Sequence, residues 1–121
     1  MKVLAIRGAT TVKTNTKDEI LKESASMIQT ILDENSLDKD DIISMCFTMT
    51  NDLDSIYPSV AVREILNITD IPMLNYEEKY IAGSLRKCIR VMMHVNTNKS
   101  KHEVKHIYLN SASNLRVDLQ K

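Results

Sequence analysis

The segment RKCIRVMMHV (residues 86–95) reads as an apolar β-strand that is interrupted by one charged residue, Arg90. Successive side chains of a strand point to opposite faces of the sheet. This alternation predicts one face formed by Ile89, Val91, Met93 and Val95, and an opposite face formed by Cys88, Arg90, Met92 and His94.

Arg90 is the residue of this segment that needs an explanation. A guanidinium keeps its charge in proteins, and an unpaired buried cation is costly. Arg90 could lie at the surface or pair with a glutamate; alternatively, its face could bind an anion. Arg7, in VLAIRGATTV, sits on a similar strand. Two guanidiniums in one groove would suit a carboxylate or phosphate ligand.

The rest of the chain predicts an α+β fold with the element order β-α-β-α-β-β-β. The predicted strands are residues 2–8, 41–50, 71–77, 82–97 and 104–110, and the predicted helices are residues 16–36 and 58–67. The first strand should end at Gly8, and the nearly continuous apolar run in 41–50 predicts a strand covered on both faces. The last two strands should pair as an antiparallel hairpin. One mixed β-sheet with its helices packed on one face would accommodate this order.

Helix 16–36 has the strongest local signals. Thr16 and Glu19 form a capping-box pattern. An apolar stripe at three- and four-residue spacing follows. It comprises Ile20, Leu21, Ala25, Met27, Ile28, Ile31 and Leu32. In helix 58–67, Pro58 suits the first position.

Composition narrows the class of protein. The chain has 121 residues, which fits one domain (1–121) with a tail from about residue 111. Its net charge of zero argues against nucleic-acid binding. The initial apolar run is too short for a signal peptide or a membrane span, so we expect a cytoplasmic protein with Cys46 and Cys88 as reduced core thiols.

The segment HEVKH (residues 102–106) matches the zinc-protease motif, but its context does not. That motif requires a helix, and the flanking sequence indicates a turn followed by a strand. On a strand, His102 and His106 would lie about 13 Å apart, too far to share a metal. The chain also lacks GxGxxG, P-loop, CxxC and GxSxG motifs. We therefore expect no metal and no cofactor.

Four segments together resemble the AroH-type chorismate mutases. They are IRGATTV (6–12), YPSVAVRE (57–64), KCIRVMMHV (87–95) and HIYLNSASNLR (106–116). The resemblance extends from Ile6 to about Leu119, and its most specific parts are IRGATT and KCIRVMM. It implies a homotrimer with a pseudo-α/β-barrel fold and active sites between subunits.

The family rearranges chorismate to prephenate on the route to phenylalanine and tyrosine. The resemblance implies that Arg90 donates to the breaking ether oxygen, and that Arg7 and Tyr108 hold a carboxylate. Glu78 would accept from the ring hydroxyl. Alone, Glu78 could equally be a surface charge and Tyr108 a structural residue. Arg63 and Arg116 match residues at the site mouth, whereas Tyr57, Ser59, Met73, Leu74, Asn75 and Leu115 match wall positions.

The chain departs from the family at a few of these positions. Asn75 replaces a common Cys, Tyr57 a common Phe, and Val60 a common Lys. Two other functions fit a trimer that binds carboxylates: a non-catalytic small-carboxylate-binding protein, and an imine deaminase of the Rid type. Glu78 with Tyr108 and the KCIRVMM segment favour the mutase.

Overall fold

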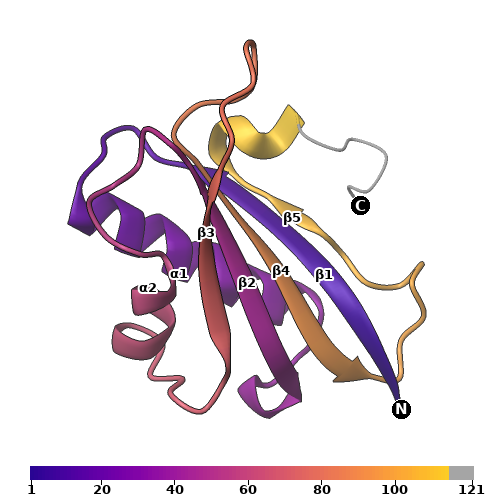
Figure 1. The fold of residues 1–121 in the computed structure, drawn as a ribbon. Helices are drawn as coiled ribbons and strands as arrows, with labels where there is room; N and C mark the ends of the chain where they lie inside the picture. Colours follow the sequence, from indigo (N-terminus) through magenta and orange to yellow (C-terminus); the bar gives the residue numbers. More distant parts are fainter. Residues whose placement is uncertain (115–121) are drawn as a thin grey trace.

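The computed structural model describes residues 1–114 and contains a five-stranded mixed sheet (Figure 1). The strand order is β3-β2-β4-β1-β5. β4 pairs antiparallel with β1 and β2, whereas β3 and β5 are parallel to β2 and β1. The predicted α+β class is confirmed. The bounds are β1 Lys2–Thr11, α1 Lys17–Glu34, η1 Lys39–Asp41, β2 Ile42–Thr50, α2 Ser59–Glu64, β3 Met73–Glu78, β4 Cys88–Thr97, β5 Ile107–Tyr108 and η2 Asn110–Asn114.

The central strand, β4, has the alternation that its sequence predicts. Ile89, Val91, Met93 and Val95 are buried, whereas Arg90 and His94 are half-buried and Met92 is exposed. The buried face of β4 points to α1, and the opposite face carries Arg90.

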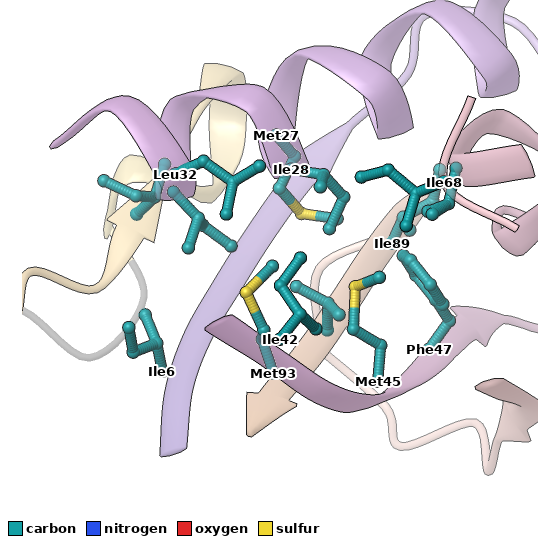
Figure 2. Close-up of a cluster of buried hydrophobic side chains, with 14 of the residues drawn as sticks. Ile6, Met27, Ile28, Leu32, Ile42, Met45, Phe47, Ile68, Ile89 and Met93 are labelled. Carbon is teal, nitrogen blue, oxygen red and sulfur yellow. The ribbon is translucent and has the colours of Figure 1, made fainter. Parts of the chain in front are cut away.

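Helix α1 covers one face of the sheet and completes the core between them (Figure 2). The Thr16 hydroxyl accepts from the Glu19 N–H at 3.3 Å, so the predicted cap is present. Ile20, Ala25, Met27, Ile28, Ile31 and Leu32 are buried as predicted. Met27 and Ile28 lie above Met93 and Met45 of the sheet in Figure 2. Burial of these aliphatic side chains holds the helix on the sheet.

Gly8 does not end the first strand, because β1 continues to Thr11. A Cβ at Gly8 would lie 2.8 Å from Ile31 Cδ1 and 3.0 Å from Val91 Cγ1. The absence of a side chain therefore lets α1 pack closely on β1. The role of Gly8 is in packing, and the predicted strand end at this residue is wrong.

The predicted hairpin of the last two strands is wrong. β5 pairs with β1 in parallel, and β4 already has β1 and β2 at its two edges. A strand has only two edges for backbone hydrogen bonds. The 104–110 segment therefore crosses to the free edge of β1, and only Ile107–Tyr108 form a strand.

Residues 82–87 form a loop, although the sequence predicted a strand from residue 82. Gly83 and Lys87 have φ angles of 83° and 49°, in the left-handed region that a strand excludes. β4 begins only at Cys88.

The prediction that residues 41–50 are covered on both faces is also wrong for the single chain. Met45, Phe47 and Met49 are buried, whereas Ser44, Cys46 and Thr48 are only half-buried. We refer to the sheet surface opposite α1 as the open face. Its residues include Val3, Ala5, Arg7, Cys46, Thr48, Leu74, Tyr76, Glu78, Arg90 and Met92.

Candidate active site

A groove of about 540 Å³ crosses the open face. It brings together Arg7 of β1, Glu78 of β3 and Arg90 of β4, which were all predicted site residues. Its complete lining is Arg7, Cys46, Thr48, Glu78, Arg90, Val91 and Met92. Three charged side chains from three strands thus converge on one surface hollow.

Strand register places Arg90 in a row of side chains that runs across the whole sheet. In this row Tyr76 pairs with Thr48, Thr48 with Arg90, Arg90 with Ala9, and Ala9 with Tyr108. Directly paired residues point to the same face. Ala9 is fully buried between Arg90 and Tyr108, so the row has a small residue between its two large hydrogen-bond donors.

Arg90 and Glu78 form an ion pair in the groove. Arg90 Nε lies 3.3 Å from Glu78 Oε2, and the two side chains are 31% and 22% exposed. Nevertheless, buried Arg90 Nε makes no hydrogen bond within the described residues. The two charges lie close together, but the geometry of the pair leaves the Nε–H without a hydrogen-bond acceptor within the described residues.

Tyr108 contributes a second buried donor. Its hydroxyl has no hydrogen-bond partner within residues 1–114. Buried polar groups are nearly always hydrogen-bonded in native proteins, so each exception calls for an explanation. Tyr108 belongs to β5 next to β1, whose Arg7 N–H donates to His106 Nδ1 at 2.9 Å. Two unpaired donors in one row suit an anionic or oxygen-rich ligand.

Other predicted site residues gather elsewhere in the single chain. Tyr57 and Asn75 line a second hollow of about 560 Å³ beside β3. Asn75 Nδ2 donates to the Ser59 hydroxyl at 2.8 Å, and the Ser59 N–H donates to Asn75 Oδ1 at 3.3 Å. Arg63 is exposed on α2. None of these residues lines the groove that contains Arg90.

The remaining wall and mouth positions divide between the edge strand and the chain end. Leu74 is 57% exposed on the open face, and its neighbour Met73 is half-buried. Leu115 and Arg116 lie outside the described residues, which end at residue 114. The structure therefore neither supports nor contradicts the positions expected for those two.

Sequence reasoning missed four residues that line the groove: Cys46, Thr48, Val91 and Met92. Thr48 is the polar one of these, and its hydroxyl donates to Glu78 Oε2 at 2.5 Å. Alternation in ISMCFTMT would have put Thr48 opposite the buried Phe47 and Met49, but only the strand order places it beside Arg90.

The HEVKH segment is not helical. His102 and Glu103 lie in a turn, and His106 begins the bridge to β1. Residues 1–114 contain no group of three or more His, Cys, Asp or Glu side chains arranged to hold a metal. Within the same range, no helix has the length and hydropathy needed to cross a bilayer.

Both cysteines are free. Burial raises the pKa of the Cys88 thiol, and the positive charge of nearby Arg90 offsets only part of this effect. A buried thiol with a raised pKa is a poor nucleophile. Cys88 therefore serves packing beside Arg90.

Comparison with known proteins shows which family contains this chain. The family described as "Chorismate mutase type I" matches residues 3–119. The chain is 38% identical to the chorismate mutase AroH of Bacillus subtilis, covering 98% of this chain and 94% of the relative. It is 34% identical to the AroH of Thermus thermophilus, covering 98% and 97%.

A solved structure supports the same relationship. The chorismate mutase from Clostridium thermocellum superposes with a TM-score of 0.90 and 49% sequence identity, over 93% of this chain and 99% of that one. The sheet order, the groove with its two arginines and the match along nearly the whole sequence lead to one assignment: this chain belongs to the AroH-type, type I chorismate mutase family.

Proposed function

We propose that this protein is an isomerase that converts chorismate to prephenate by a pericyclic Claisen rearrangement, a step in phenylalanine and tyrosine biosynthesis. The observation that carries the proposal is the convergence of Arg7, Glu78 and Arg90 in one groove. Chorismate is a dianion, and Arg presents a planar fork that suits carboxylates. Family membership supplies the reaction.

Arg90 is the main electrostatic catalyst in this proposal. As the ether C–O bond of chorismate breaks, negative charge develops on its oxygen, and a fixed guanidinium stabilises that charge. Arg90 Nε is buried and without a hydrogen bond in residues 1–114, so it needs no release from a protein acceptor before it donates to the substrate. Because the pair with Glu78 already orients the side chain, little reorganisation accompanies the reaction.

Arg7 and Glu78 of the groove, together with Tyr108 in the same sheet row as Arg90, hold the compact conformer of the substrate. Arg7 and the Tyr108 hydroxyl bind the enolpyruvyl carboxylate, and Glu78 accepts a hydrogen bond from the ring hydroxyl. Every reacting atom is present in the substrate, so no nucleophile or proton transfer is required of the protein. Holding two reacting ends in contact is itself a large catalytic effect. No cofactor takes part in this scheme.

We further propose that the working form is a cytoplasmic homotrimer, with each site completed by a neighbouring subunit. The exposed apolar side chains of the open face support this arrangement: Leu74 is 57%, Tyr76 50% and Met92 38% exposed. Contiguous apolar surface commonly marks an interface. Tyr57, Ser59, Arg63, Met73, Leu74 and Asn75 would then face Arg7, Arg90 and Tyr108 across the contact, with Leu115 and Arg116 near the mouth.

A direct assay tests the function. Chorismate is added to purified protein, the loss of its absorbance is followed, and the product is identified as prephenate. Turnover that saturates with chorismate is the expected result. Binding without turnover would contradict the proposal and favour a non-catalytic carboxylate-binding trimer. Neither binding nor turnover would contradict it too, and would direct attention to imine deamination.

A further inference from the structure

Thr48 lies on β2, the strand between β4, which carries Arg90, and β3, which carries Glu78. β2 lies between β4 and β3 in the sheet, and Thr48 pairs directly with Arg90 on one side and with Tyr76 on the other. Adjacent strands are about 4.8 Å apart, so the backbones of β3 and β4 are separated by about 9.6 Å. The long side chains of Arg90 and Glu78 meet above Thr48.

The Thr48 hydroxyl holds the Glu78 carboxylate in position through a hydrogen bond. Its Oγ1 donates to Glu78 Oε2 at 2.5 Å, and the same oxygen lies 3.3 Å from Arg90 Nε. One carboxylate oxygen thus receives both interactions. A hydrogen bond to an ionised group is short and strong, and a β-branched side chain on a strand has few rotamers. Thr48 therefore fixes the position of Oε2.

We infer that Thr48 is a positioning residue for the mutase reaction, acting through Glu78 on Arg90. Without its hydroxyl, Arg90 becomes the nearest partner of Glu78 Oε2. The carboxylate then moves onto the guanidinium and forms the direct hydrogen bond that is absent in the native geometry. Such a bond withdraws the Nε donor from the ether oxygen. This inference depends on the proposed mutase activity and on the roles proposed for Arg90 and Glu78.

The expected defect is in turnover more than in affinity. Interactions that strengthen in the transition state affect kcat, whereas uniform binding affects KM. Thr48→Val keeps the side-chain shape but removes the hydroxyl. We expect it to lower kcat by about 10-fold, with KM changed by less than about threefold, since one hydrogen bond to a charged group is lost. Thr48→Ser keeps the hydroxyl and should retain kcat within about threefold.

A double-mutant cycle with Glu78→Gln separates positioning from a general structural role. If Thr48 acts through the Glu78 carboxylate, Thr48→Val should cost less than about threefold on the Glu78→Gln background. Thr30→Val is the matched control: the Thr30 hydroxyl donates to Ser26 within α1, away from the groove. That control should leave kcat and KM unchanged. Melting temperature and oligomeric state are measured for every variant.

The outcomes distinguish this inference from the proposed function. If the wild-type protein has no mutase activity, the function fails and this role of Thr48 fails with it. If the wild type is active but Thr48→Val retains full kcat, only the positioning role is overturned. Equal losses for Thr48→Val on the wild-type and Glu78→Gln backgrounds would also overturn it, as would a Thr48→Ser variant as impaired as Thr48→Val.

Discussion

Arg90 combines a fixed charge with a directional donor, and its surroundings make both properties matter. Cys88, two residues earlier on β4, and Ala9, its partner on β1, are both buried, so the guanidinium extends from packed surroundings with 31% of the side chain exposed. In such a partly desolvated position, a donor aimed at developing charge is worth more than in water. The charge alone does not reproduce this arrangement, because the planar fork sets the direction of its N–H groups.

Arg90→Lys should therefore lower kcat by at least about 100-fold, although it keeps the positive charge. Steady-state kinetics with chorismate measures this. Arg86→Lys makes the same exchange four positions earlier, outside the groove, where the guanidinium lies over the Tyr80 ring at 4.8 Å. That control should stay within about threefold of wild type. Near wild-type turnover in Arg90→Lys would rule out the proposed role of the fork.

At the scale of elements, the loop between β3 and β4 joins the strands that carry Glu78 and Arg90. Asp52, just beyond β2, holds the end of this loop. Its carboxylate accepts from the Lys87 N–H at 2.9 Å and from the Thr50 hydroxyl at 2.5 Å, and it pairs with Arg86 Nε at 3.5 Å. Lys87 has a φ angle of 49°, a conformation that costs a non-glycine residue free energy. The Asp52 hydrogen bonds offset that cost where β4 begins.

Asp52→Asn should make the protein less stable at neutral pH by about 1–2 kcal/mol, because charge-assisted hydrogen bonds are lost. Burial by itself would raise the pKa of Asp52, but the hydrogen bonds from Thr50 and Lys87 and the charge of Arg86 outweigh it and hold the pKa below its ordinary value of 3.8. The folded protein thus binds this proton less tightly than the unfolded chain. The stabilisation is present above pH 3.8 and is lost as the pH falls through the lower, folded-state pKa.

Denaturant unfolding at a fixed protein concentration, from pH 7 down to about pH 3, measures this difference in stability. The gap between wild type and Asp52→Asn should narrow at the acidic end. Asp70→Asn, at an exposed position, is the control and should match wild type at neutral pH. A gap that stays constant over the whole range would show that the Asp52 charge does not contribute.

The elements that local pattern decides were predictable, and those that long-range pairing decides were not. Alternation within one strand predicted the faces of β4, and the Thr16 cap and apolar spacing predicted α1. The order of the strands is a property of the whole sheet. The crossing of β5 to β1 and the position of Thr48 beside Arg90 therefore had no local signal. Gly8 looked like a strand end because the sequence near it gives no sign that α1 packs closely against it. That contact is also non-local.

At the scale of the whole molecule, predicted site residues within 1–114 line two separate hollows of a single chain. Arg7, Glu78 and Arg90 line the groove, whereas Tyr57 and Asn75 line the hollow beside β3. The groove lies on the open face, where Leu74 and Tyr76 are exposed to solvent. Antiparallel and mixed sheets can leave one face to water, but large exposed apolar side chains there favour coverage by another subunit. A symmetric assembly would bring the two groups together at every interface.

Mixed trimers test this arrangement. Arg90→Ala removes the catalyst from one group, and the double variant Tyr57→Ala/Arg63→Ala removes contacts from the other. If each site takes one group from each of two subunits, co-refolding the two inactive proteins in equal amounts should restore about a quarter of the sites, because a random neighbour pair is intact with that probability. Each variant refolded alone is the control and should stay inactive. Mixed assemblies, verified by mass, that recover no activity would indicate sites built within single subunits.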